Sequence, residues 1–211
     1  MGAVFLLAFL KRRVSMDVLD NKLQYLILVF FLVMGITAGT FTVSNMTHIN
    51  KLALLEYISM LLHSVKTQSI DYFSVFIHSF LQDTLIFGAI AMFSLLMIGM
   101  PAITAILIFK GFCVGFTVGA LSLNIGSGGF LAIIFCTFIP NLVLLPCVCK
   151  AGVLGLNNSI TVFKNRKIPN TARDRMISSK PHFARMFKVY LFSMIGVFLE
   201  TLLTPALIKL L

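Results

Sequence analysis

The sequence predicts an all-α, polytopic membrane protein, and three observations support that prediction. Of the 211 residues, 59% are hydrophobic and only 11% are charged, whereas a soluble domain carries roughly 25% charged residues. The mean hydropathy is +1.01. The apolar residues also gather in runs long enough to cross a bilayer core of about 30 Å as helices. Too little polar sequence remains to cover a water-soluble fold, which excludes a soluble enzyme, a disordered chain and a disulfide-stapled secreted module.

Five runs have the length of about 20 residues that a spanning helix needs. The long apolar stretch after residue 80 contains two of them, because Gly99-Met100-Pro101 divides it and proline is tolerated in the first turn of a helix. A division after Lys110 would leave a second piece, residues 111–125, of only about 22 Å. We expect one membrane domain with a cytoplasmic segment, 1–22, and transmembrane spans at 23–43, 80–99, 101–125, 130–149 and 189–208.

The basic residues predict the orientation of these spans. The chain has 17 Lys and Arg against 7 Asp and Glu, a net charge of +10. If the N-terminus is cytoplasmic, 13 of the bases lie inside and only Lys51, Lys66 and Lys209 lie outside, as the positive-inside rule requires. The C-terminus is then outside.

The densest basic segment is the predicted cytoplasmic loop at 150–188, with turn residues at Asn157-Asn158. Such a cluster next to a span attracts anionic lipid headgroups. No aromatic-interleaved or helix-turn-helix pattern accompanies it, so we expect no nucleic-acid partner.

The outer segment, residues 44–79, has apolar residues at helical spacing. One run contains Leu55, Ile58 and Leu62, and a second contains Phe73 and Phe76. Both predict amphipathic helices that lie at the outer interface or pack against the spans. Anchoring at the interface and binding of a partner protein are both consistent with this pattern, and these five residues are the candidates for a partner-binding surface.

Three polar residues fall inside the predicted spans at similar depth: Lys110, Asn141 and Glu200. A charge at mid-membrane costs at least about 2.5–3.5 kcal/mol, so we expect Lys110 and Glu200 to pair and Asn141 to add a hydrogen bond. Such a cluster can be structural or part of an ion or proton relay. Pro140 and Pro146 bracket Asn141 and are expected to kink that span.

Small residues mark the predicted helix contacts, because close approach replaces the hydrophobic force that is missing in lipid. Gly35 and Gly39 lie four apart in the first span, and Gly111, Gly115 and Gly119 form a stripe in the third. The spacing predicts packing within one chain or between copies, which leaves a homo-oligomer open.

The sequence offers no recognisable catalytic or metal-binding set. The four cysteines lie in apolar runs without zinc-ligand spacing. The acids expected outside, Glu56, Asp71 and Asp83, lie on or beside amphipathic faces and do not form a glycosidase pair. We expect neither enzymatic activity nor a cofactor.

Several blocks, in order, resemble stage II sporulation protein M of endospore-forming bacteria. They are VMGITAGTFTVSNM at 33–46, Gly99-Met100-Pro101 with ILIFKGFCVGFTVGAL at 106–121, the segment from Asn141 to Pro146, and LETLLTPALIKLL at 199–211. Many relatives carry a Pro-His-Gly…Glu motif near Pro140–Pro146, whereas this chain has Asn141 and lacks the acid.

The resemblance implies a membrane protein needed for engulfment, when the mother-cell membrane migrates around the forespore. Its implied partners are two peptidoglycan-degrading proteins, stage II sporulation proteins D and P, which the M protein holds in the membrane as a non-enzymatic scaffold. The alternative is a small transporter or channel subunit that uses Lys110, Asn141 and Glu200.

Overall fold

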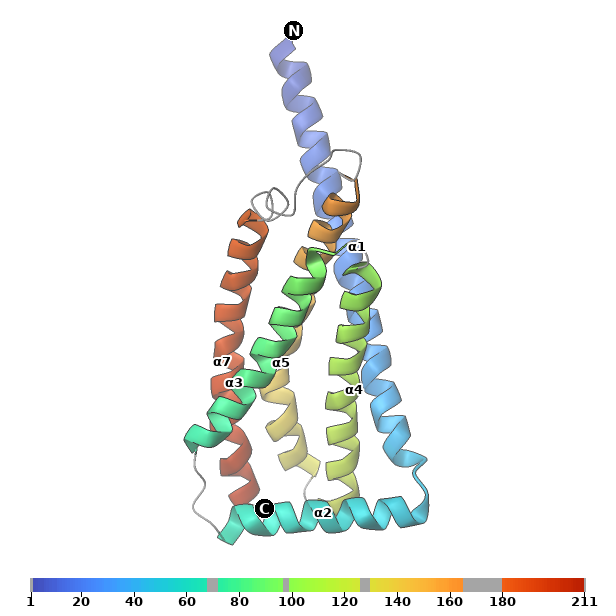
Figure 1. Cartoon of the computed structure of the whole chain (residues 1–211), viewed down its shortest axis with the longest axis vertical. Coiled ribbons are helices and arrows are strands. Elements are labelled where there is room, and N and C mark those ends of the chain that lie inside the picture. The colour runs from blue at the N-terminus through green and yellow to red at the C-terminus, as the bar shows by residue number, and fades with distance from the viewer. Residues whose placement is uncertain (1, 68–71, 97–98, 126–129, 165–179, 211) are drawn as a thin grey trace.

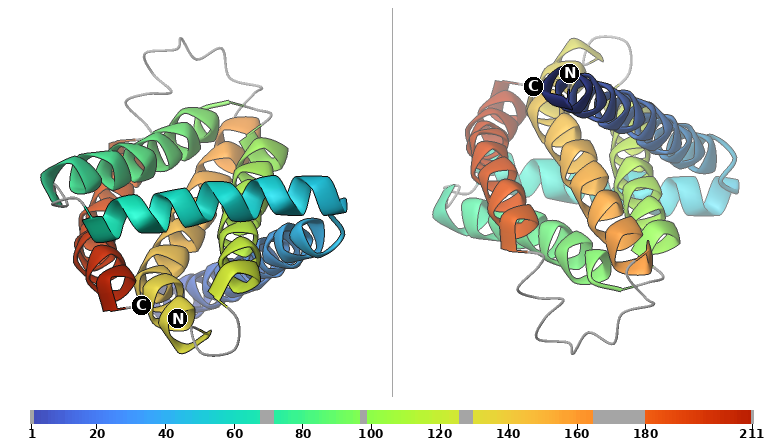
Figure 2. Two further views of the ribbon diagram at one scale, coloured as in Figure 1. Left: turned by 90° about the horizontal axis from the view of Figure 1, so that it is seen from below. Right: turned by 90° about the horizontal axis from the view of Figure 1, so that it is seen from above.

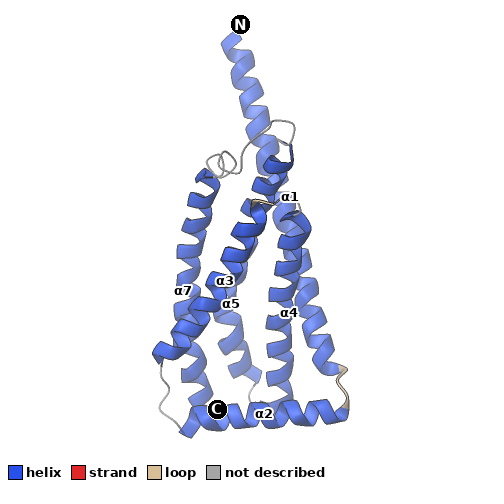
Figure 3. Cartoon of the chain, in the orientation of Figure 1, coloured by secondary structure: helices blue, strands red, loops and turns tan. Residues whose placement is uncertain are grey.

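The computed structural model describes the chain except residues 1, 68–71, 97–98, 126–129, 165–179 and 211, and describes side chains over 22–60, 72–96, 99–123, 137, 139–162 and 182–203. Within these residues the secondary structure is helical throughout (Figure 3). The helices are α1 (Gly2–Ser44), α2 (His48–Thr67), α3 (Tyr72–Ser94), α4 (Gly99–Ile125), α5 (Phe130–Lys164) and α7 (Lys180–Leu210).

Five of the described helices are long and apolar enough to cross a membrane, which confirms the predicted fold class. The candidate spans are Lys22–Ser44, Tyr72–Ser94, Gly99–Leu123, Ile139–Val162 and His182–Leu203. These helices run along the long axis of the molecule, α1, α4 and α7 in one direction and α3 and α5 in the other (Figure 1). The two ends of the chain therefore lie at opposite ends of the bundle.

Helix α2 lies across the end of the bundle at which α1 stops (Figures 1 and 2). Lys51 fixes the turn between the two helices, because its Nζ donates a hydrogen bond of 2.7 Å to the carbonyl oxygen of Ser44 in the last turn of α1. A cation is favourable at that position, where helix carbonyls are left without partners.

Several boundaries differ from the predicted ones; the last spanning helix, for example, begins at Lys180 instead of residue 189. The second spanning helix begins at Tyr72 instead of residue 80, so Phe73 and Phe76 belong to its first turns, and the outer segment contains one lateral helix rather than two. The rings of Phe76 and Phe80 stack one turn apart, with centroids 6.0 Å apart, which joins the aromatic run to the span. Helix α5 continues to Lys164, so the Asn157-Asn158 pair lies within a helix and the prediction of a turn there is wrong.

The predicted break at Gly99 is confirmed, since α4 begins at that residue and Pro101 lies in its first turn. A side chain at position 99 would meet the carbonyl oxygen of Phe93 and, at 2.8 Å, the hydroxyl of Ser159. Helix α5 continues through Pro140 and Pro146, so neither proline ends it, and the kink remains a prediction.

The glycine stripes form the close contact between α1 and α4. A Cβ added at Gly35 would meet the carbonyl oxygen of Ile108, and one added at Gly39 would meet that of Phe112. Gly111 and Gly115 approach the backbone of α1 in the same way, at Leu32 and Ile36. Packing within one chain therefore accounts for both stripes. A third stripe member, Gly119, lies against the side chain of Val43.

Candidate functional site

The candidate site is a buried charge cluster that joins α3, α4 and α7. Lys110 Nζ of α4 lies 3.8 Å from Asp83 Oδ1 of α3, and the two side chains are only 11% and 3% exposed. Helical rise places Lys110 about 16 Å from Gly99, the first residue of α4. Asp83 lies at the midpoint of α3. Both charges are therefore deep inside the spanning part of the bundle.

The sequence prediction had the right cation but a different partner for its ion pair. Asp83 was counted with the outer acids because a span begun at residue 80 puts it in the first, outer turn, and the earlier start at Tyr72 moves it to mid-helix. Glu200 of α7 is half-buried and interacts electrostatically with both Lys110 and Asp83. Among the described residues, however, the ion pair of Lys110 is formed with Asp83.

Asn141 does not join this cluster. Its Nδ2 donates a hydrogen bond of 2.8 Å to the carbonyl oxygen of Thr137, one turn back in α5. Its side chain lines a groove between α1, α4 and α5, on which Lys110 and Glu200 do not lie. The predicted three-residue cluster is thus replaced by Asp83, Lys110 and Glu200.

One hydroxyl group contacts the Asp83 carboxyl, and two more lie in the same contact between α3 and α7. Ser193 of α7 is fully buried, interacts with the Asp83 carboxyl, and donates a hydrogen bond of 2.8 Å to the Tyr190 carbonyl. One turn of α3 carries both Asp83 and Thr84, and the Thr84 hydroxyl lies 2.8 Å from the Tyr190 hydroxyl. The polar side chains that the sequence analysis did not identify thus lie in the contact between α3 and α7, here called the α3–α7 seam. A predicted helix that began at Tyr72 would have indicated this contact.

The composition of the cluster determines its chemistry. Two carboxyl groups face one ammonium group, so the cluster carries an excess negative charge when all three are ionised. An uncompensated charge at this depth is costly, and Asp83 Oδ2 is buried without a hydrogen-bond partner. The arrangement can stabilise the packing of three helices and can also hold one proton.

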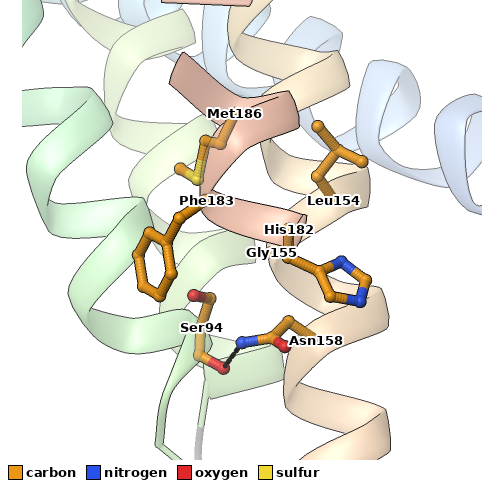
Figure 4. Close-up of a pocket in the computed structure, with 7 residues that line it drawn as sticks. All are labelled: Ser94, Leu154, Gly155, Asn158, His182, Phe183 and Met186. Carbon is orange, nitrogen blue, oxygen red and sulfur yellow. Dashed lines mark hydrogen bonds between the residues drawn. The ribbon is translucent and has the colours of Figure 1, made fainter. Parts of the chain in front are cut away.

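A second polar contact lies near the start of α7 and the end of α3 (Figure 4). Asn158 Nδ2 donates a hydrogen bond of 3.1 Å to the carbonyl oxygen of Ser94, and the Ser159 hydroxyl donates one of 2.9 Å to that of Leu96. Ser94 is the last residue of α3 and Leu96 lies just beyond it, so neither carbonyl has a partner four residues on in the same helix. The Leu96 carbonyl also accepts a hydrogen bond of 3.1 Å from the Gly99 N–H. His182 of α7 lies beside Asn158, and its Nδ1 is buried without a hydrogen-bond partner. This contact ties α5 to the α3–α4 connection.

Helix α2 presents two opposite faces. Leu55 and Ile58, two of the candidates for a partner-binding surface, are half-buried and 8% exposed, on the face toward the bundle. The exposed face instead carries Ile49, Leu52 and Tyr57, which are 79%, 54% and 61% exposed. Of the placements that the sequence left open, α2 thus adopts packing against the spans, because its apolar stripe lies on the helix ends of the same chain.

The remaining members of the predicted surface are placed as follows. Phe73 is exposed at the start of α3, and Phe76 is half-buried. The side chain of Leu62 lies outside the described residues. Among the described side chains, no group of three or more His, Cys, Asp or Glu residues is arranged to hold a metal ion.

The five spanning helices, the buried charge cluster and the lateral helix define a polytopic, all-helical membrane protein. The chain belongs to the stage II sporulation protein M family, whose model matches residues 27–205. Membership implies a role in sporulation. No curated protein and no solved structure matches the chain.

Proposed function

We propose that this protein is a non-enzymatic scaffold in the bacterial cell membrane that anchors and localises peptidoglycan-degrading proteins during forespore engulfment. Family membership supports the sporulation setting. The observation that carries the scaffold role is the exposed apolar face of α2, which lies across one end of the bundle.

The two faces of α2 suit it to docking. Ile58 and its neighbours hold the helix on the bundle, whereas Ile49, Leu52 and Tyr57 point away from it. Ile49 and Leu52 are three residues apart, and Tyr57 lies about two turns after Ile49, so Leu52 and Tyr57 flank Ile49 on the exposed side of the helix. Exposed apolar clusters on a folded surface mark interaction sites, and tyrosine is enriched in protein interfaces.

The distribution of charge supports an outer position for α2. The basic residues of the N-terminal part of α1, the end of α5 and the start of α7 lie at the opposite end of the bundle. If that end is cytoplasmic, α2 faces the compartment that contains peptidoglycan. The engulfing mother-cell membrane is the proposed location, with anionic lipid headgroups at the basic end.

The proposed partners on the α2 face are stage II sporulation proteins D and P, which the family resemblance implies. A pull-down from sporulating membranes tests this assignment. The variant Leu52→Ser with Tyr57→Ser removes exposed apolar surface and is expected to reduce recovery of both partners several-fold. Its membrane level should stay normal, because exposed substitutions usually change stability by less than about 0.5 kcal/mol.

Ile58→Ala is the matched control on the opposite face. It should lower the membrane level of the protein through lost packing, while recovery of the partners per molecule stays unchanged. If the outer-face variant recovers as much of both partners per molecule as the unaltered protein does, α2 is not the docking surface.

A further inference from the structure

A groove between α1, α4 and α5 lies in the spanning region of the bundle. Its volume is about 600 Å³, within the range of roughly 300–1,000 Å³ in which proteins bind small molecules. Its walls are almost entirely apolar, with Val29 and Val33 from α1, Val118 from α4, and Leu142 and Leu145 from α5.

The position of the groove restricts what can fill it. The lining residues belong to three candidate membrane spans, so the contents must be apolar where the bilayer core surrounds them. An α-helix with its side chains is about 10–12 Å across, so a neighbouring helix would insert only a few side chains into this volume. A flexible acyl chain can occupy its full length.

Two lysines extend the walls of the groove beyond one end. Tyr25 of α1 and Cys149 of α5 face each other at that end. Lys22 lies three residues before Tyr25, and Lys150 lies four residues after the lining residue Pro146, so each lysine continues a lining face of its helix. Both lysines are exposed, and neither forms an ion pair with a described side chain.

The geometry points to a binding site for an anionic phospholipid, with an acyl chain in the groove and the phosphate held between Lys22 and Lys150. An exposed lysine in a spanning helix directs its ammonium group along its stem toward the headgroups. Lys22 and Lys150 come from antiparallel helices, and each lies beyond the last lining residue of its helix at this end, Tyr25 and Cys149. Lys22 begins its candidate span and Lys150 lies within its own, so the Lys150 stem has to carry its ammonium group toward the headgroups. The Tyr25 hydroxyl lies between them and the apolar walls, where it can donate a hydrogen bond to a lipid ester or phosphate oxygen.

This site differs from general attraction to the basic end of the protein. A diffuse basic surface retains any anionic headgroup regardless of its chains, whereas the groove needs the chain and the charge together. Free phosphate and glycerol phosphate share only the headgroup chemistry, so they distinguish the two cases.

The test uses the full chain in nanodiscs of phosphatidylcholine that contain a phosphatidylglycerol with a photoreactive acyl chain. After illumination, mass spectrometry locates the adducts. The expected adducts are on groove residues such as Val33, Val118 and Leu142. Unlabelled phosphatidylglycerol should compete better than phosphatidylcholine, and glycerol phosphate should not compete.

Variants then test the two charges. Lys22→Gln and Lys150→Gln should each weaken competition by phosphatidylglycerol about fivefold relative to phosphatidylcholine. Lys188→Gln is the matched control, because Lys188 is an exposed lysine of α7 that does not border the groove. The helix content of each variant is measured by circular dichroism. The two lysines are replaced singly, so that the test still stands if one of the two variants is unstable.

Three results would overturn the site: adducts confined to the basic segment, a lipid preference that Lys188→Gln lowers as much as Lys22→Gln, or a second copy cross-linked across the groove. If glycerol phosphate competes as well as phosphatidylglycerol does, the acyl chain does not contribute to binding, and the proposed site is likewise overturned.

Discussion

Lys110 and Asp83 form an ion pair between α4 and α3, with Nζ and Oδ1 3.8 Å apart and both side chains almost fully buried. Glu200 of α7 lies within electrostatic reach of both. The single cation is thus shared by two acids, and this asymmetry gives the first prediction.

Removal of the cation should cost more than removal of its nearest acid. Lys110→Met leaves two carboxyl groups without a counter-charge and should destabilise the protein by about 3 kcal/mol, the lower end for a broken buried pair. Asp83→Asn leaves Glu200 to balance Lys110 and should cost less than about 1.5 kcal/mol. Denaturant unfolding in micelles measures both values. Equal losses for the two variants would show that Glu200 does not share the cation.

The position of Asp83 depends on where α3 begins, which the sequence alone did not determine. Residue spacing placed Lys110 inside a span correctly, because its neighbours are apolar on both sides. The start of α3 depended on an aromatic run that is compatible with either a lateral helix or a span. The predicted start was eight residues too late, which put Asp83 in the outermost turn of the span instead of at its middle. A helix boundary is set by packing, which the local sequence does not contain.

The glycine stripes and the apolar stripe of α2 show what residue spacing predicts and what it leaves open. The spacing of Gly35, Gly39, Gly111 and Gly115 predicts contact because small residues four apart let the backbone of a second helix approach closely. The apolar stripe containing Ile58 also predicts burial, but spacing does not say against what. The bundle of the same chain supplies that surface, and the opposite face of α2 is exposed.

The contact between α1 and α4 should be sensitive to a single methyl group. A Cβ at Gly115 would meet backbone atoms of Ile36, which cannot move as a side chain end can. We expect Gly115→Ala to destabilise the protein by about 1–3 kcal/mol through overpacking. Gly88→Ala is the control, since a Cβ there meets nothing within 4 Å, and it should be neutral or stabilising by up to about 1 kcal/mol. Equal unfolding midpoints for the two variants would contradict the close approach.

The seam between α3 and α7 should depend on one hydroxyl group. The Thr84 hydroxyl donates to the Phe80 carbonyl, so Tyr190 is the donor in the 2.8 Å bond between Tyr190 and Thr84. Tyr190→Phe keeps the ring contacts with Phe80 and Phe87 and removes that donor. The expected loss is about 0.6 kcal/mol, typical of hydrogen bonds inside membrane proteins.

Tyr57→Phe is the control for this change, because Tyr57 is exposed on α2. Its unfolding free energy should not change. If Tyr57→Phe lowers the free energy of unfolding as much as Tyr190→Phe does, the loss comes from removing any tyrosine hydroxyl and not from the hydrogen bond in the α3–α7 seam.

The proposed orientation can be measured directly. In a cysteine-free background, Glu56→Cys on α2 should react with a membrane-impermeant maleimide in intact spheroplasts, because the positive-inside rule puts this end outside. Arg185→Cys, exposed near the start of α7, should react only after permeabilisation. The reverse pattern would invert the topology and remove α2 from the peptidoglycan side.

The scaffold and conduit functions separate at the charge cluster. The triple variant Asp83→Asn, Lys110→Met, Glu200→Gln removes all three charges with little change of volume, and replacement of a whole buried ionic group is often neutral for stability. A scaffold that docks its partners through α2 should therefore keep its membrane level and recover stage II sporulation proteins D and P as before. A conduit that needs these charges would lose its transport in the same variant. Loss of partner recovery at an unchanged membrane level would mean that the cluster, and not α2 alone, controls the docking surface.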